Sequence, residues 1–154
     1  MTGNAHDPRL WTPEEVEEIL RRHAGREGPL MPILGDVQAA FGHVPEGAVP
    51  IIAAALNLSR AEVHGVVSFY HDFRRAPASR PVVKLCRAEA CQARGVEELA
   101  PLLEQDERIE LETVYCLGLC ASGPSALVGD RVYARLDRTN VTDMVALAAR
   151  GEPR

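Results

Sequence analysis

The sequence predicts an α+β protein, with a bundle of helices first and a small α/β domain after it. In residues 12–73, apolar side chains recur at helical spacing, and this stretch holds none of the four cysteines. From residue 81 onward, short apolar or alternating runs typical of strands are interspersed with helical stretches. We therefore expect a tail over residues 1–11, a helical bundle over 12–73, a linker over 74–80 and the α/β domain over 81–154.

A capping box predicts the first helix. Thr12 and Glu15 have the spacing at which each side chain can cap the other's backbone, and Trp11 stands where it can contact Val16. Apolar residues at helical spacing then predict a helix that continues to about Arg26.

Three further stretches complete the predicted bundle. After the interruption at Pro29–Pro32, a second helix is expected to end at Gly42. Residues 48–57 form an alanine-rich apolar run whose first helical residue the pattern leaves open. Ser59 and Glu62 form a second capping box. The helix after this box is predicted to turn four side chains inward, namely Val63, Val66, Val67 and Tyr70.

Two predicted strands in the second half each end at a cysteine. Residues 81–85 are a short apolar run, which predicts a buried strand that leads into Cys86. Residues 95–105 have helical spacing, and residues 109–115 alternate as a strand that leads into Cys116. The alternation predicts four residues on one face, namely Ile109, Leu111, Thr113 and Tyr115.

A hairpin and a helix complete the predicted domain. The runs 126–128 and 131–136 flank Gly129-Asp130, a two-residue hairpin signal. A final helix is expected with Thr139 or Asn140 as its N-cap. The resulting order is strand, helix, strand, strand, strand, helix. This order predicts a small α/β sandwich with the cysteines on loops beyond strand ends, where ligands commonly bind.

Composition excludes several functions. A net charge of −5 and a pI near 5.5 argue against a nucleic-acid-binding protein, which normally has a basic face. The apolar runs are too short to cross a bilayer, and the polar, acidic start differs from a signal peptide. We therefore expect a cytoplasmic protein. In a reducing cytosol, paired cysteines are more often metal ligands or redox groups than structural disulfides.

The four cysteines have the spacing of a tetrathiolate metal site. They form a C-x4-C pair, Cys86 and Cys91, and a C-x3-C pair, Cys116 and Cys120. Four thiolates can hold either a [2Fe–2S] cluster or a structural zinc ion, and spacing alone leaves these two about equally favoured. Dithiol redox chemistry is less favoured because the sequence has no C-x-x-C. A Rieske centre is also less favoured, because it needs two histidines and all five precede the linker.

The residues around the cysteines resemble a known family. Cys86-x4-Cys91 and Cys116-Leu-Gly-Leu-Cys120-Ala-x-x-Pro124 are similar to the thioredoxin-like [2Fe–2S] subunit of NAD-linked flavin dehydrogenases. The resemblance covers roughly residues 12–150 and includes motifs of the helical half, namely Leu34-x-Asp36-Val37-Gln38, Val44-Pro45-Glu46, Leu56-Asn57-Leu58-Ser59 and Val63-x-Gly65-Val66-Val67-Ser68-Phe69-Tyr70. It favours the cluster strongly over zinc.

The resemblance implies a fold, a cofactor and a role. The second domain would be a thioredoxin-like [2Fe–2S] ferredoxin domain, with Cys86, Cys91, Cys116 and Cys120 as the iron ligands. The chain would transfer electrons beside a partner subunit that binds FMN and NAD, within a complex that has a larger catalytic subunit, and would have no catalytic residue of its own. The stretch from His64 to His71 looks most similar to the gamma subunit of NAD-dependent formate dehydrogenase. A hydrogenase or complex I-like parent is the alternative, and a zinc-stapled interaction module is the alternative of another class.

Other notable residues have plainer interpretations. His64 and His71 share a helix face but have no carboxylate or cysteine at ligand spacing, so ordinary half-buried helix positions are favoured. Three aromatic residues could anchor a partner or belong to the core, namely Phe69, Tyr70 and Phe73. Arg87 and Arg94 could add positive charge near the cysteines, although solvated side chains are favoured. The sequence has no G-x-G-x-x-G or Walker motif, which places NAD and FMN elsewhere.

Overall fold

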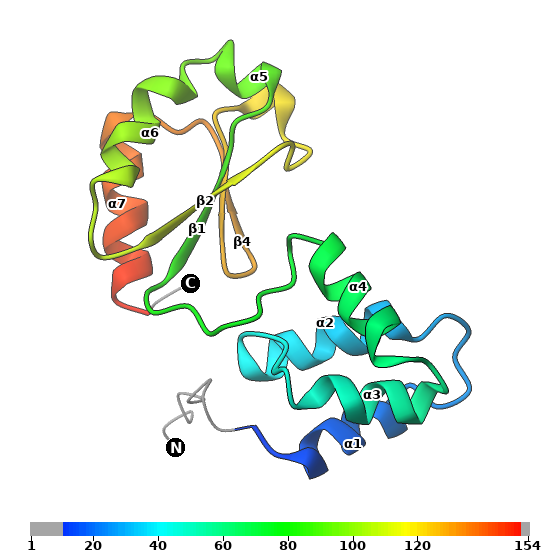
Figure 1. The fold of residues 1–154 in the computed structure, drawn as a ribbon. Coiled ribbons are helices and arrows are strands. Elements are labelled where there is room, and N and C mark those ends of the chain that lie inside the picture. The colour runs from blue at the N-terminus through cyan, green and yellow to red at the C-terminus, as the bar shows by residue number, and fades with distance from the viewer. Residues whose placement is uncertain (1–10, 152–154) are drawn as a thin grey trace. The chain divides into compact units, whose positions relative to one another are not determined.

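The computed structural model describes residues 11–151 and divides the chain into two compact units between Pro77 and Ala78 (Figure 1). Each unit has its own hydrophobic core, one in the helical half and one in the half that contains the sheet. The predicted α+β class, with helices first and a mixed α/β unit second, is confirmed. Residues 1–10 of the predicted tail lie outside the described residues.

The first unit contains four helices around one apolar core. They are α1 (Pro13–Arg22), α2 (Leu30–Phe41), α3 (Ala48–Leu56) and α4 (Arg60–Phe69). α1 and α4 each contact α3. The fully buried side chains at the centre include Val16, Ile33, Leu34, Phe41 and Ile52. A hydrogen bond of 2.9 Å between His23 Nε2 and Asp36 Oδ2 joins the end of α1 to α2.

Both predicted capping boxes are present. The Thr12 hydroxyl accepts from the N–H of Glu15 at 3.3 Å, and the Glu15 carboxylate accepts from the N–H of Thr12 at 3.0 Å. The same reciprocal pair forms between Ser59 and Glu62 at the start of α4. These contacts satisfy backbone N–H groups that have no partner within the helix.

Three expectations about the helices were wrong. α1 ends at Arg22 rather than near Arg26, and glycines with positive φ, such as Gly25, lead the chain away. α2 begins at Leu30, ahead of Pro32, because a proline in the first turn removes only an N–H that lacks a helical partner. Tyr70 does not complete the inward stripe. It lies beyond the last residue of α4, and 44% of it is exposed.

The second unit is built on a four-stranded sheet. Its elements are β1 (Val82–Cys86), α5 (Glu89–Gln92), α6 (Val96–Glu104), β2 (Glu110–Val114), the short 3-10 helix η1 (Cys120–Ser122), β3 (Ala126–Val128), β4 (Arg131–Tyr133) and α7 (Arg138–Ala149). The strand order is β2-β1-β3-β4, with β1 parallel to β2 and the other neighbours antiparallel. The predicted two-residue hairpin is confirmed, because Val128 pairs with Arg131.

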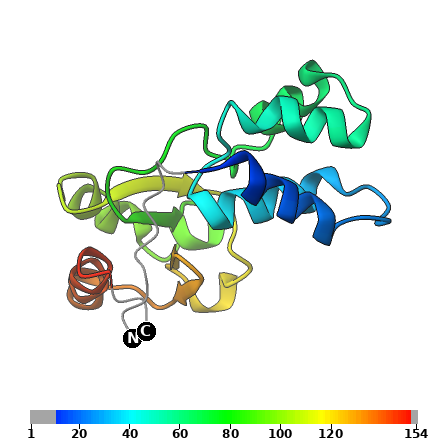
Figure 2. The same cartoon turned by 90° about the horizontal axis from the view of Figure 1, so that it is seen from below.

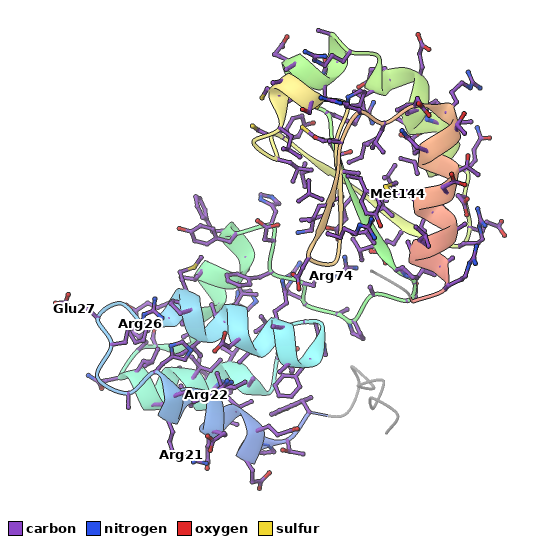
Figure 3. The ribbon with its side chains drawn as sticks, turned by 180° about the vertical axis from the view of Figure 1, so that it is seen from behind. Arg21, Arg22, Arg26, Glu27, Arg74 and Met144 are labelled. Atoms are coloured by element: carbon purple, nitrogen blue, oxygen red, sulfur yellow. The ribbon has the colours of Figure 1, made fainter. Side chains whose placement is uncertain are left out.

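Two helices cover the sheet. α6 contacts β2, α7 contacts β1, and the two helices contact each other, so they form one layer (Figure 2). Met144 extends from α7 toward the strands (Figure 3) and is 1% exposed. It lies among buried aliphatic side chains that include Val83 and Leu85 of β1. β1 is thus anchored in this core, and it ends at the first cysteine.

Local details of this unit differ from expectation. The cap of α7 is Asp137, whose carboxylate accepts from the N–H groups of Thr139 and Asn140 at 2.9 Å each, so neither of those residues is the cap. β2 ends at Val114, and Tyr115 beyond it is 76% exposed, so Tyr115 is not on a buried face. Thr113 is exposed as well. Two further differences are that α5 was not expected and that β4 ends at Tyr133.

Candidate metal centre

Parallel pairing of β1 and β2 brings two cysteine-bearing loops to one edge of the sheet. Cys86 is the last residue of β1 and pairs in register with Val114, the last residue of β2. The N–H of Arg87 continues this pairing by donating to the Val114 carbonyl at 2.9 Å. Because parallel strands end at the same edge, Cys116 leaves the sheet beside the place where Cys86 ends it.

Cys91 reaches the same place from α5. The turn after β1 is closed by the N–H of Cys91, which donates to the Ala88 carbonyl at 2.9 Å. α5 contacts η1, the short helix that begins at Cys120. The chain comes close to Cys91 at Gly123, the residue after η1, where an added Cβ would lie 3.1 Å from Cys91 Sγ. A glycine therefore lets the second cysteine loop lie directly against Cys91.

Cys116 and Cys120 lie on an exposed loop of unusual backbone shape. Cys116 has a φ of 90° and Gly118 a φ of 76°, conformations that fold the loop back on itself. The N–H of Gly118 consequently donates to Cys116 Sγ at 3.4 Å. Both cysteines of this loop are exposed, whereas Cys86 is 3% and Cys91 is 2% exposed.

The thiols contact one another as two pairs. Cys91 hydrogen-bonds to Cys86, and Cys120 hydrogen-bonds to Cys116. All four are free cysteines. Across residues 11–151, no three or more His, Cys, Asp or Glu side chains are grouped so that they could hold a metal ion. The predicted ligands therefore lie as two pairs, an inner buried pair and an outer exposed pair, rather than as one gathered group.

Backbone donors from both loops converge on Cys86. Burial opposes ionisation of this thiol, but the N–H groups of Ala88, Cys116 and Leu117, together with the Cys91 thiol, donate to its sulfur, and the net result is a lowered pKa. A sulfur surrounded by backbone N–H groups is typical of sites that hold anionic clusters. The donors come from segments before and after the intervening helix α6, so the fold itself assembles them.

Two thiols, those of Cys91 and Cys120, have raised pKa values. Burial, and then the neighbouring Cys86, raise the pKa of Cys91, while hydrogen bonds from Ser125 partly offset this. The hydrogen bond and charge of Cys116 raise the pKa of Cys120. Burial of Cys91, and competition for negative charge within each pair, therefore disfavour ionisation of these two thiols.

Two arginines lie near the site. Arg87 donates from Nε to Glu97 at 3.0 Å and contacts Glu104 at 3.4 Å, so its charge is paired on α6. This pairing lowers the pKa of Glu97. Arg94 is exposed, and its Cδ would lie 3.3 Å from a Cβ added at Gly123. Arg87 therefore links the turn after β1 to α6, so the sequence-based expectation of a simply solvated side chain is wrong.

The donor set fits a [2Fe–2S] cluster chemically. Such a cluster is held by four cysteine thiolates, and its charge is stabilised by hydrogen bonds to sulfur. The four thiols form two pairs, and N–H groups already point at the Cys86 and Cys116 sulfurs. The sequence predicted the two strands that lead to Cys86 and Cys116. Ser125 and α5 were not predicted, because neither a single serine nor a four-residue helix leaves a periodic signal.

The architecture defines a class of protein. A sheet of order β2-β1-β3-β4 with helices packed on it, preceded by a helical bundle, is an α+β protein of thioredoxin-like fold. Residues 16–149 match the family described as thioredoxin-like [2Fe-2S] ferredoxin, and the chain belongs to that family.

Curated relatives of this chain are subunits of oxidoreductase complexes. The NADP-reducing hydrogenase subunit HndA of Solidesulfovibrio fructosivorans is 27% identical over 143 residues, which cover 86% of this chain and 84% of HndA. A subunit of the NADH-quinone oxidoreductase of Escherichia coli is 27% identical over 143 residues, 86% of each chain. The alpha subunit of the NAD-reducing hydrogenase HoxS of Cupriavidus necator is 29% identical over 147 residues, but this chain spans only 24% of its length.

Solved structures show the same fold. A chain of an NAD⁺-reducing [NiFe]-hydrogenase in the H₂-reduced state superposes with a TM-score of 0.68 at 22% identity. The match covers 81% of this chain and 23% of the hydrogenase chain. In the part of the chain that the structure describes, no helix has the length and apolar character needed to cross a membrane.

Proposed function

We propose that this chain is the electron-transfer subunit of a cytoplasmic NAD-dependent oxidoreductase and that Cys86, Cys91, Cys116 and Cys120 hold one [2Fe–2S] cluster. A single observation carries the proposal. Within a chain of the thioredoxin-like [2Fe-2S] family, two contacting thiol pairs lie at one sheet edge, with three backbone N–H groups directed at the Cys86 sulfur.

The surroundings of the cysteines support a role in exchanging electrons. A bound [2Fe–2S] cluster supplies one-electron redox chemistry. The buried pair, Cys86 and Cys91, would hold its side of the site away from water, while the exposed pair, Cys116 and Cys120, would leave the other side open to a partner. The backbone donors would balance negative charge on sulfur without movement of a side chain.

The partner that we propose is a subunit that binds FMN and NAD. Relatives of this chain are subunits of NAD- or NADP-linked hydrogenases and of an NADH-quinone oxidoreductase. A flavin exchanges two electrons with NAD as hydride, and a one-electron carrier beside it would accept or return them singly. We propose that this chain has no catalytic acid, base or nucleophile of its own.

For the parent complex, we propose an NAD-dependent formate dehydrogenase, with this chain as its gamma subunit. The sequence from His64 to His71 supports this assignment through its resemblance to that sub-family. A hydrogenase or complex I-like parent is the alternative, and the relatives named above favour it.

Spectroscopy of the purified chain tests the cluster. Anaerobically purified protein is expected to be brown, with iron and acid-labile sulfide in equal amounts. It should be EPR-silent as isolated and give a rhombic spin-one-half signal after dithionite reduction. A colourless protein with stoichiometric zinc would overturn the proposal and leave a structural module stapled by four cysteines.

Isolation of the native complex tests the parent. The tagged chain, expressed from its own chromosomal position, is expected to copurify with a subunit that contains FMN and reduces NAD. A large subunit that contains molybdenum supports formate dehydrogenase, whereas nickel and iron support a hydrogenase. Recovery of a membrane-bound quinone reductase instead would support the complex I-like alternative.

A further inference from the structure

Ser125 is a buried polar residue beside the inner cysteine pair. It is 1% exposed and directly precedes β3. In the described residues, only one other polar or charged residue is buried, namely His43 in the helical unit. A buried hydroxyl needs a hydrogen-bond partner, because a polar group that is buried without one destabilises the folded state.

Three polar groups of Ser125 engage the two buried cysteines. Its carbonyl accepts from the N–H of Cys86 at 2.9 Å. Its hydroxyl oxygen lies 3.7 Å from Cys91 Sγ, within hydrogen-bond range for sulfur. Its own N–H also donates toward the Cys91 sulfur. One residue thus fixes the end of β1 and the position of the second thiol.

We propose that Ser125 is a positioning residue whose hydroxyl donates a hydrogen bond to the Cys91 thiolate and raises the reduction potential of the cluster. This inference rests on the proposed [2Fe–2S] function. Between a free thiol and a hydroxyl, either atom can be the donor. A metal-bound thiolate has no proton, so the Ser125 hydroxyl becomes the donor of the pair.

The direction of the effect follows from charge. Reduction adds one electron, delivered by the flavin partner or by dithionite, and no bond to Ser125 forms or breaks. The added negative charge is shared by the thiolate sulfurs, and a hydrogen bond to a charged acceptor is stronger than one to a less charged acceptor. The hydroxyl therefore stabilises the reduced state more than the oxidised state, and the potential is higher with it than without it.

The test measures the midpoint potential of the full chain in matched variants. Ser125→Ala removes the hydroxyl and keeps both backbone groups, and Ser125→Thr restores a hydroxyl. Ser122→Ala is the control. Ser122 is half-buried in the same loop, and in the described chain no cysteine sulfur is a hydrogen-bond partner of its hydroxyl. Potentials come from anaerobic redox titration followed by the EPR signal of the reduced protein.

We expect Ser125→Ala to have a more negative midpoint potential than the wild type. The equilibrium constant for reduction should fall about tenfold, which corresponds to about 59 mV for one electron. Ser125→Thr and Ser122→Ala should stay close to the wild type. An unchanged potential in Ser125→Ala, with the cluster fully assembled, would overturn the inference. So would an equal shift in Ser122→Ala.

A second variant covers the case in which Ser125→Ala fails to assemble a cluster. Ser125→Cys keeps a similar shape with a weaker donor, and its potential should lie below that of the wild type. A potential equal to that of the wild type would overturn the inference. Failure of the proposed function has a different signature, because the wild type itself would then give no reduced EPR signal.

Discussion

Cys86 and Val114 end two parallel strands in register, and the next residue, Arg87, donates its N–H to the Val114 carbonyl at 2.9 Å. As a result, the backbone after β2 passes directly beside the Cys86 thiol. The N–H groups of Cys116 and Leu117 both reach its sulfur. Backbone pairing in the sheet therefore positions the candidate centre, and side chains of the two loops complete it.

Replacing one outer and one inner cysteine should separate ligation from folding. Cys116→Ser and Cys91→Ser are both expected to abolish the cluster, measured as iron, sulfide and visible absorbance. In the apo proteins only Cys91→Ser should lose stability, by about 1–3 kcal/mol, because it buries a more polar group. Cys116 is exposed, so its change should stay within about 0.5 kcal/mol. Retention of full absorbance in Cys116→Ser would contradict its assignment as a ligand.

Gly123→Ala should disturb the centre through the close contacts of one added Cβ, which would meet Cys91 and Arg94. Gly123 has a φ of −67°, which alanine adopts freely, so any cost arises from its new Cβ. That Cβ would lie 3.1 Å from Cys91 Sγ, and we expect a loss of about 1–3 kcal/mol with lower iron content. Thermal unfolding and iron analysis measure both.

Gly35→Ala provides the matched control for the glycine test. Gly35 lies within α2, and an added Cβ would meet no atom within 4 Å. This substitution should stabilise the helical unit by about 0.5–1 kcal/mol, because alanine favours the helix. A Gly123→Ala protein with wild-type iron content and stability would show that the second loop does not need its close approach to Cys91.

Local signals in the sequence predicted much of this fold. The capping boxes at Thr12 and Ser59 and the hairpin at Gly129 depend on residues within four positions of one another, so their structure follows from their spacing. The strands that lead to Cys86 and Cys116 were also recognisable, because burial in a sheet imposes apolar or alternating runs.

Tertiary contacts decided the rest. Tyr70 and Tyr115 continue an apolar pattern past the last residue of a helix and of a strand, and there the backbone turns them to the surface. The role of Ser125 depends on Cys91, which is distant in sequence and reaches it only through the sheet and α5. A single hydroxyl has no spacing rule that could reveal such a partner. The thiols were predictable, whereas the groups that surround them were not.

The capping box of α4 should make the helical unit sensitive to acid. The N–H and the hydroxyl of Ser59 both donate to Glu62, and these hydrogen bonds lower the pKa of Glu62 below its ordinary value of 4.5. Because the folded pKa is lowered, the stabilisation is complete above the ordinary value and is lost as pH falls through the folded value. Thermal unfolding of Glu62→Gln and the wild type should therefore differ at neutral pH and converge in acid. A pH-independent difference would contradict the charge-assisted cap.

The aromatic residues at the end of α4 should affect association rather than folding. Phe69 is 74% exposed and packs edge-to-face on Tyr70, with ring centroids 5.1 Å apart. Phe69→Ala is expected to lower the free energy of unfolding by less than about 1 kcal/mol. Val67→Ala, the buried control on the same helix, should cost about 2 kcal/mol because it leaves a cavity. Denaturant unfolding measures both changes.

Exposed aromatic residues are frequent anchors at interfaces, so Phe69→Ala should also reduce the amount of flavin-containing subunit that copurifies. If Phe69→Ala destabilises the chain as much as Val67→Ala does and copurification is unchanged, these aromatic residues belong to the core instead.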